Sequence, residues 1–164
     1  DGLALGETTP GPLIMVVAFV AFVGGYGKAV FGPDALFLAG AVAACLLGYP
    51  AEETPEPIAP DTPAIFVPLL ELEALAPGSW YLNVLATYAP YRGKGLGSAL
   101  LARAEEIAKA AGHRTISLIA ADTHHEALRL YTAKGFREVT RRPVIKGDWQ
   151  VEASEWVLFT RPVG

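Results

Sequence analysis

Hydrophobic residues are concentrated in the first third of this chain. Two long apolar runs, Leu13–Val23 and Ala35–Gly48, lie on either side of a glycine-rich segment. A run of about eighteen apolar residues indicates a membrane span, whereas runs of about ten to fourteen are more typical of a buried core. No basic region precedes Leu13, which argues against a signal peptide. We therefore favour core-forming segments over a membrane span for both runs.

The middle of the chain has the pattern of a loop followed by a short helix. Tyr49–Pro63 contains five of the thirteen prolines and four acidic residues. Because proline is excluded from helix interiors and central strands, this segment is predicted to be an exposed loop. Ala64–Ala76 is apolar apart from Glu71 and Glu73, and it predicts a helix that the following Pro-Gly pair ends.

From residue 80 onwards the pattern alternates between strand and helix. Aromatic and β-branched runs predict strands, and leucine and alanine at helical spacing predict helices. Thr123 and Glu126 have the spacing of a capping box at the start of the second helix. This βαβαββ order predicts an α/β domain with a parallel portion in its sheet. The predicted elements are a strand over Trp80–Tyr88, a helix over Leu96–Ala111, a strand over Arg114–Ala121, a helix ending at Lys134, and strands over Phe136–Arg142 and Glu155–Arg161.

Composition limits the class of protein. The chain has 164 residues, of which 52% are hydrophobic and 18% charged, with a mean hydropathy of +0.33. This length is enough for one domain with its own core. The single cysteine, Cys45, cannot form an internal disulfide, which favours a reducing compartment and a cytoplasmic location. Its apolar neighbours predict that Cys45 is a buried small hydrophobe.

Charge is unevenly divided along the chain. The net charge of −4 and the isoelectric point near 5.4 argue against a general nucleic-acid-binding protein. Residues 1–91 carry a formal charge of −8, whereas residues 92–164 carry +4. An anionic ligand would therefore bind to the second half of the chain.

A glycine-rich turn lies between the first predicted strand of this half and the helix that follows. Such a turn leaves backbone N–H groups unobstructed at the positive end of the helix dipole, where phosphate oxygens bind readily. Arg92 and Lys94 add formal positive charge to the turn. The residues alone therefore predict a ligand that carries phosphate.

Three phosphate-binding templates can be compared with this turn. A Walker P-loop ends in Gly-Lys-Ser/Thr, which is missing here. The dinucleotide fingerprint G-x-G-x-x-G is not met either, because Gly93, Gly95 and Gly97 are one residue short of it. The template [RQ]-x-x-G-x-[GA] is met in full by Arg92–Gly97.

With this loop, the chain resembles the GNAT superfamily of acyl-CoA-dependent N-acyltransferases. The resemblance extends from about Ala35 to the C-terminus, and includes a downstream A-x-x-x-Y-x-x-x-G-F pattern that begins at Ala127. It implies a mixed sheet flanked by helices in an acyltransferase domain over residues 35–164. It also implies an enzyme that transfers an acetyl group from acetyl-CoA, as co-substrate, to a primary amine of a small molecule or protein, without a metal.

The resemblance also implies roles for particular residues. The loop would bind the pyrophosphate of coenzyme A, and the preceding strand would offer backbone groups to the pantetheine arm and the thioester carbonyl. Tyr131 would give a proton to the leaving thiolate. His124 stands where the family usually has an asparagine that contacts the cofactor arm, and a ring nitrogen could make the same contact. The residues expected to bind the cofactor are Leu85, Ala86, Thr87, Arg92, Gly93, Lys94, Gly95, Leu96, Gly97, Ser98 and His124.

No motif identifies the base that takes the amine's proton. Glu71, Glu73 and Asp122 are candidates, although each is more often a solvated surface carboxylate, and water could also take the proton. The neighbouring histidines at 124 and 125 do not predict a metal site, because consecutive helical residues point about 100° apart. Trp80, Tyr81 and Trp149 could line a substrate pocket, but core positions are favoured for all three.

The N-terminal segment, residues 1–34, departs from the family. Residues 1–32 resemble an internal segment of the chromate ion transporter family and are either a gene-fusion remnant or a replacement for missing elements. Because an exposed apolar sheet edge needs a cover, Leu13–Val23 is expected to pack on the domain or on a second copy. A homodimer is therefore possible, and association with a membrane is disfavoured. The alternative function is a non-catalytic or membrane-associated coenzyme A-binding module.

Overall fold

The computed structural model describes residues 44–147 and 151–164. Every strand and helix predicted from residue 80 onwards is present, and the helix predicted within Ala64–Ala76 forms as well. The described elements have the following bounds: strands β1 (Ala44–Pro50), β2 (Trp80–Thr87), β3 (Thr115–Ala121), β4 (Arg137–Pro143) and β5 (Glu155–Pro162), helices α3 (Val67–Glu73), α4 (Leu96–Ala110) and α5 (His125–Ala133), and the 3-10 turn η2 (Ala89–Tyr91).

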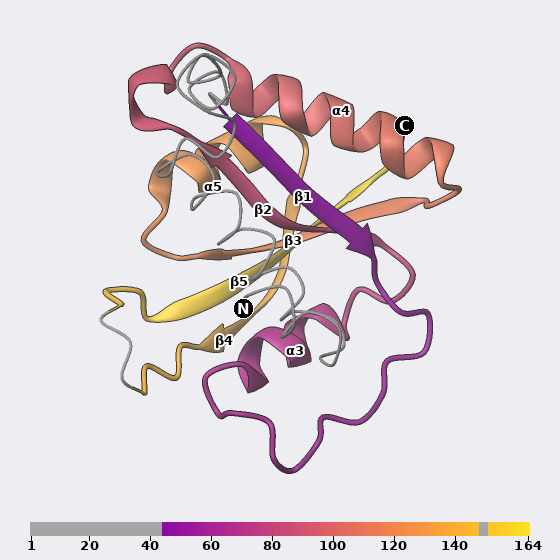
Figure 1. Cartoon of the computed structure of the whole chain (residues 1–164), viewed down its shortest axis with the longest axis vertical. Helices are drawn as coiled ribbons and strands as arrows, with labels where there is room; N and C mark the ends of the chain where they lie inside the picture. The colour runs from indigo at the N-terminus through magenta and orange to yellow at the C-terminus, as the bar shows by residue number, and fades with distance from the viewer. Residues whose placement is uncertain (1–43, 148–150) are drawn as a thin grey trace, which may run out of the picture.

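The described strands form one five-stranded mixed sheet in the order β1-β2-β3-β5-β4 (Figure 1). The β2–β3 pair is parallel and is connected through α4, whereas the other three pairs are antiparallel. The predicted mixed sheet with a parallel portion and flanking helices is therefore confirmed.

Strand β2 is irregular near its middle. On β1, the neighbouring residues Leu47 and Gly48 pair with Val84 and Leu82, so Asn83 is an extra residue on β2. The parallel pairing of β2 with β3 runs only from Trp80 to Leu82. The bulge thus coincides with the point where the described ladder between β2 and β3 ends. Beyond it, the backbone of β2 no longer pairs with β3.

The bulge is matched by a close approach at Gly48. A Cβ atom at this position would lie 2.7 Å from Nε1 of Trp80 and 2.9 Å from the backbone oxygen of Tyr81. These distances are shorter than real Cβ contacts, so only glycine allows β1 to lie this close to β2. The sequence of β1 therefore fixes the register next to the bulge.

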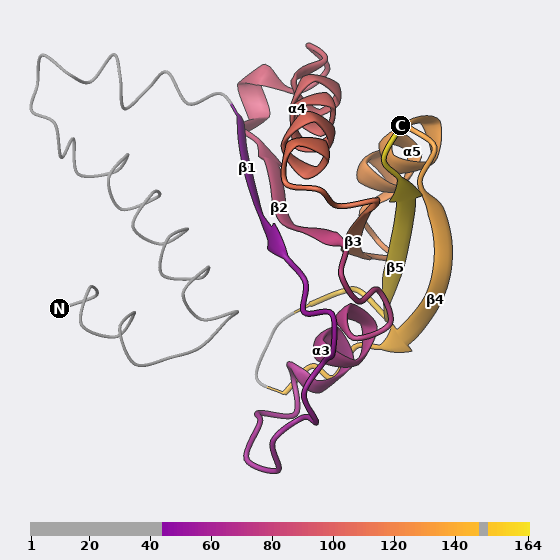
Figure 2. The same ribbon diagram turned by 90° about the vertical axis from the view of Figure 1, so that its right-hand side faces the viewer.

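The two faces of the sheet are covered by different helices. Leu82 and Leu118 belong to a core cluster with residues of α4 and α5, whereas Leu158 packs with Leu72 of α3 in a second cluster. Since side chains alternate along a strand, the second cluster lies on the opposite face. Figure 2 shows α4 beside β1 and β2, and α3 near the other end of the strands.

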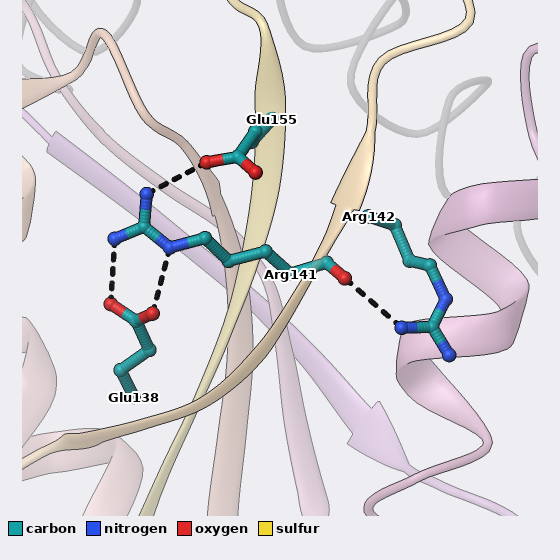
Figure 3. A network of polar contacts seen from close by, with 4 residues as sticks. All are labelled: Glu138, Arg141, Arg142 and Glu155. Carbon is teal, nitrogen blue, oxygen red and sulfur yellow. Dashed lines mark hydrogen bonds and ion pairs between the residues drawn. The ribbon is translucent and has the colours of Figure 1, made fainter.

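Polar contacts hold α3 against the edge strand β4. Nε of Arg142 donates to Glu71 at 2.8 Å. The neighbouring Arg141 donates to both Glu138 and Glu155, at 2.7 to 2.8 Å (Figure 3). Half-exposed ion pairs such as these contribute little stability singly. The Arg142–Glu71 pair links α3 to β4, whereas the pairs of Arg141 link residues of β4 and β5.

Two predictions about local structure need correction. The predicted capping box is wrong, because the N-cap of α5 is His124 and no side chain caps the helix. The backbone N–H of His125 donates instead to the Thr123 carbonyl at 2.9 Å, so the chain is still in a turn at residue 123. The loop predicted over Tyr49–Pro63 begins two residues later, because Tyr49 and Pro50 end β1.

Several expectations fall outside the described residues. They are the packing of Leu13–Val23, the resemblance of residues 1–32 to a transporter segment, and the position of Trp149. In the part of the chain that the structure does describe, no helix has the length and apolar character needed to cross a membrane.

Candidate active site

A cleft of about 910 Å³ lies between the C-terminal end of β2, the loop before α4, and the start of α5. It is located on the part of β2 that follows the bulge, where the ladder to β3 has ended. The residues on its wall are Leu85, Ala86, Thr87, Tyr91, Arg92, Gly93, Gly95, Leu96, Gly97, Ser98, Thr123, His124, His125, Glu126, Ala127, Leu130 and Tyr131.

The loop before α4 depends on two glycines with positive φ. Gly93 has φ of 73° and Gly95 has φ of 80°, and a Cβ atom at either position would meet nothing within 4 Å. The requirement for glycine is therefore conformational, and it leaves open space beside the loop. That space belongs to the cleft, so a ligand can approach the backbone closely.

Gly95 is also the N-cap of α4 and has no side chain to cap the helix. The first hydrogen bond within the helix runs from the N–H of Ala99 to the carbonyl of Gly95, at 3.0 Å. The N–H groups of the three residues between them, Leu96–Ser98, therefore have no partner within the helix. These donors and the helix dipole favour a negatively charged group in the cleft.

Gly97 serves a different purpose, which is contact between the two helices that border the cleft. A Cβ atom at Gly97 would lie 2.9 Å from Cδ2 of Leu130 in α5. The missing side chain thus lets the first turn of α4 lie close to α5, and the two helices form adjacent walls of one cleft.

Two cations flank the loop in different ways. Nε of Arg92 donates to the carbonyl of Thr87 at 3.2 Å, which fixes the guanidinium at the mouth of the cleft. The ammonium of Lys94 lies 5.1 Å from the centre of the Tyr91 ring. Lys94 is the one predicted cofactor-binding residue that is not on the cleft wall. Its predicted contact with the cofactor therefore has no support from its position.

Tyr131 lies where α5 meets the core. Only 7% of the residue is exposed, and its ring packs against Phe136 and Phe159 with centroids 5.9 and 6.2 Å away. Burial raises the pKa of the Tyr131 hydroxyl above its ordinary value. Because Tyr131 also borders the cleft, it can present a protonated phenol to a ligand there at neutral pH.

The structure brings the predicted site residues of the β2 strand, the loop and α5 to one cleft, with Lys94 as the exception. Sequence reasoning missed several wall residues. Tyr91 adjoins the loop motif and could have been found from it, and Ala127 lies four residues before Tyr131, which is helical spacing. The missed residues are Tyr91, Thr123, His125, Glu126, Ala127 and Leu130.

The three carboxylates considered as bases have different surroundings. Glu71 is paired with Arg142, and Oδ1 of Asp122 accepts the backbone N–H of Ser154 at 3.1 Å. Glu73 accepts the hydroxyl of Tyr49 at 3.0 Å. Burial raises the pKa of Glu73, while the hydrogen bond from Tyr49 lowers it and the charge of Glu52 raises it further. Of the three, Glu73 has the surroundings of a stronger base.

Comparison with known proteins gives a family match. The acetyltransferase (GNAT) family pattern matches residues 27–136. The comparison with curated proteins gives no significant match. The family match covers β1 to α5, and thus every wall of the cleft. Residues 1–26 lie outside it.

Two solved structures resemble this one. One is a GNAT family acetyltransferase from Elizabethkingia anophelis with acetyl-CoA bound, 16% identical, with a TM-score of 0.53 over 73% of this chain and 68% of that chain. The other is Ard1 from Thermoplasma volcanium, also 16% identical, with a TM-score of 0.52 over 74% of this chain and 64% of that chain. The chain thus spans about two thirds of the length of each. These likenesses show a GNAT-like fold.

Proposed function

The chain belongs to the acetyltransferase (GNAT) family, and from this premise we propose that it transfers the acetyl group of acetyl-CoA to a primary amine. The amine would be carried by a small molecule or a protein. In this proposal acetyl-CoA is a co-substrate and no metal takes part in the chemistry.

One observation carries the proposal: an anion site, a strand segment that is paired with β1 but not with β3, and a buried phenol border the same cleft. The loop and the first turn of α4 suit a pyrophosphate, because their backbone donors are exposed and Arg92 lies beside them. The segment Leu85–Thr87 has left the ladder to β3 and can pair with an extended amide-containing arm. Coenzyme A has both of these groups, in that order along one chain.

The reaction would proceed by attack of the neutral amine on the thioester carbon. The nitrogen lone pair forms the new N–C bond, and the C–S bond breaks with its electron pair on sulfur. The amine nitrogen loses one proton, and the sulfur gains one. A backbone N–H of the segment Leu85–Thr87 would stabilise the oxygen as it becomes negative. The products are an N-acetyl amide and the free thiol of coenzyme A.

Tyr131 would supply the proton that the sulfur gains. A phenol must be protonated to donate, and burial favours the protonated form by raising the pKa of Tyr131. Solvent takes up the proton that the amine nitrogen loses, and a proton from solvent restores the phenol of Tyr131. His124, exposed on the wall of the cleft, would contact the cofactor arm.

The proposal is tested by incubating the full chain with acetyl-CoA and a panel of primary amines. Free thiol release would be followed against time, and mass spectrometry would detect the acetylated amine. We expect thiol release that depends on the amine, together with a product heavier by one acetyl group. Binding of acetyl-CoA without acetylation of any amine would instead favour the alternative, a non-catalytic coenzyme A-binding module. The cytoplasmic location stays a prediction, and the homodimer stays a possibility that the sequence leaves open.

A further inference from the structure

Glu73 is a half-buried carboxylate that the steps above do not use. It ends helix α3, which lies between β1 and β2 in the chain. No ion pair involves Glu73 among residues 44–147 and 151–164, although Glu71 on the same helix is paired with Arg142. A carboxylate that is shielded from water and lacks a cation is available to bind one.

Two tyrosines from neighbouring strands lie near Glu73. The hydroxyl of Tyr49 on β1 donates to Oε2 of Glu73 at 3.0 Å. The ring of Tyr49 packs edge-on against that of Tyr81 on β2, with centroids 5.2 Å apart. Asn83, the bulged residue, lies near both tyrosine hydroxyls and lowers the pKa of each. We call these four residues, Tyr49, Glu73, Tyr81 and Asn83, the Glu73 cluster.

The Glu73 cluster lies on the face of the sheet opposite to α4. Trp80 and Leu82 pack in the core cluster beneath α4 and α5, so Tyr81 between them points to the other face. Asn83 precedes Leu85, the first cleft residue on β2, by two positions, or about 7 Å along the strand. The cluster therefore adjoins the place where β2 leaves β3 and the cleft begins.

We propose that the Glu73 cluster is the binding site for the acceptor amine, and that Glu73 accepts the proton which the amine must lose. This inference rests on the proposed acetyl transfer. It identifies the acceptor as a cationic primary amine, because the Glu73 carboxylate and the oxygen of the Tyr49 hydroxyl bonded to it can both accept N–H donors of an ammonium group.

The proton transfer completes the balance of the reaction. An ammonium ion has no lone pair, so it must lose one proton before it attacks the thioester. This proton passes to the Glu73 carboxylate, which becomes a neutral acid and then releases the proton to solvent. The amine nitrogen then has the lone pair that forms the N–C bond, and the later steps proceed as described for the neutral amine.

The surroundings of Glu73 suit this role. Burial raises its pKa, which makes the carboxylate a stronger base than an exposed one. The groups that act on it are the hydroxyl of Tyr49, which lowers its pKa, and the carboxylate of Glu52, which raises it. Burial also raises the pKa of Tyr81, so both phenols stay neutral.

The first test compares two substitutions on one helix. Glu73→Gln keeps the shape and the acceptor for Tyr49 but removes the base, whereas Glu71→Gln removes a carboxylate that faces Arg142. With the amine that the parent acetylates fastest, we expect Glu73→Gln to lower kcat/KM at pH 7 at least tenfold. Glu71→Gln should stay within about twofold of the parent. Both variants should bind acetyl-CoA as the parent does in calorimetry.

The second test uses pH, which a purely structural role would not change. The acidic limb of the kcat/KM profile should disappear in Glu73→Gln. In Tyr49→Phe the limb should move to higher pH, because the lost hydrogen bond is one that lowers the pKa of Glu73. Thermal melting provides a check on folding. Since a raised pKa makes stability fall as pH rises through it, Glu73→Gln should lose that slope and remain folded.

The outcomes separate the two proposals. If the parent acetylates amines and Glu73→Gln keeps its rate and its acidic limb, the acceptor site is wrong while acetyl transfer stands. Equal losses in Glu71→Gln and Glu73→Gln would also overturn it, since they would indicate damage to α3 itself. If the parent binds acetyl-CoA and acetylates no amine, acetyl transfer fails, and the acceptor site fails with it.

Discussion

At the scale of single residues, two titratable groups have environments that suit opposite tasks. Burial against Phe136 and Phe159 keeps the Tyr131 phenol protonated, so it can act as an acid. Glu73 is half-buried and has no ion pair within the described part of the chain, which keeps it ready to accept a proton. Groups of this kind tend to occur at functional sites, because elsewhere their desolvation would only reduce stability.

The role of Tyr131 can be tested with Tyr131→Phe, which keeps the ring and its packing. We expect kcat to fall by about a hundredfold while the affinity for acetyl-CoA stays nearly unchanged, because only the departing thiolate loses its proton donor. Steady-state kinetics and calorimetry measure the two quantities. Tyr88→Phe is the matched control, since Tyr88 is exposed and does not border the cleft.

The pH profile provides a second check on Tyr131. Because its pKa is raised above the ordinary value of about 10, the parent should not lose activity through its ionisation below that pH. A tyrosine titration by ultraviolet difference spectroscopy would measure this. If Tyr131→Phe had the kcat of the parent, Tyr131 would not be the proton donor, and its role would be packing in the core.

At the scale of elements, the cleft exists because β2 changes partners along its length. The first residues of β2 pair with β3, and the last ones border the cleft. The sequence predicted β2, the loop that joins it to α4, and both helices α4 and α5. The signals for these elements are local: aromatic and β-branched runs, helical spacing of apolar residues, and the positions of the glycines. It did not predict the bulge at Asn83, since a bulge depends on how Gly48 of another strand fits against β2.

The close approach at Gly48 predicts a specific loss of stability. In Gly48→Val, the new side chain would clash with Nε1 of Trp80 and the backbone of Tyr81. We expect the free energy of unfolding to fall by about 1–3 kcal/mol, as for other overpacked sites. Urea denaturation measures this. A variant as stable as the parent would show that β1 can shift its register without cost.

At the scale of the whole molecule, the chain divides into an acidic and a basic half. Residues 92–164 carry a formal charge of +4 and include the loop before α4 and all of α5. Sequence alone predicted this division and the mixed sheet. It could not place the Glu73 cluster, because Tyr49, Glu73 and Tyr81 are brought together by the packing of α3 and β1 on β2.

The charge division predicts that acetyl-CoA binds more weakly as salt is added. Its phosphates would interact with exposed cations such as Arg92, and salt screens such pairs. Calorimetric titrations at low and high potassium chloride should give a dissociation constant that rises severalfold. An affinity independent of salt would mean that charged groups in the second half of the chain contribute little.

The central claim, that the loop before α4 binds the pyrophosphate of acetyl-CoA, is tested most directly by calorimetry on two pairs of variants. Gly95→Val is compared with Gly112→Val, because both glycines have φ near 80° and open space around them but only Gly95 borders the cleft. Arg92→Ala is compared with Arg103→Ala, an exposed arginine of α4 paired with Glu106. We predict that Gly95→Val abolishes binding and that Arg92→Ala weakens it by about 1.5–3 kcal/mol, with both controls near the parent. Parent-like binding of acetyl-CoA by both Gly95→Val and Arg92→Ala would contradict the claim.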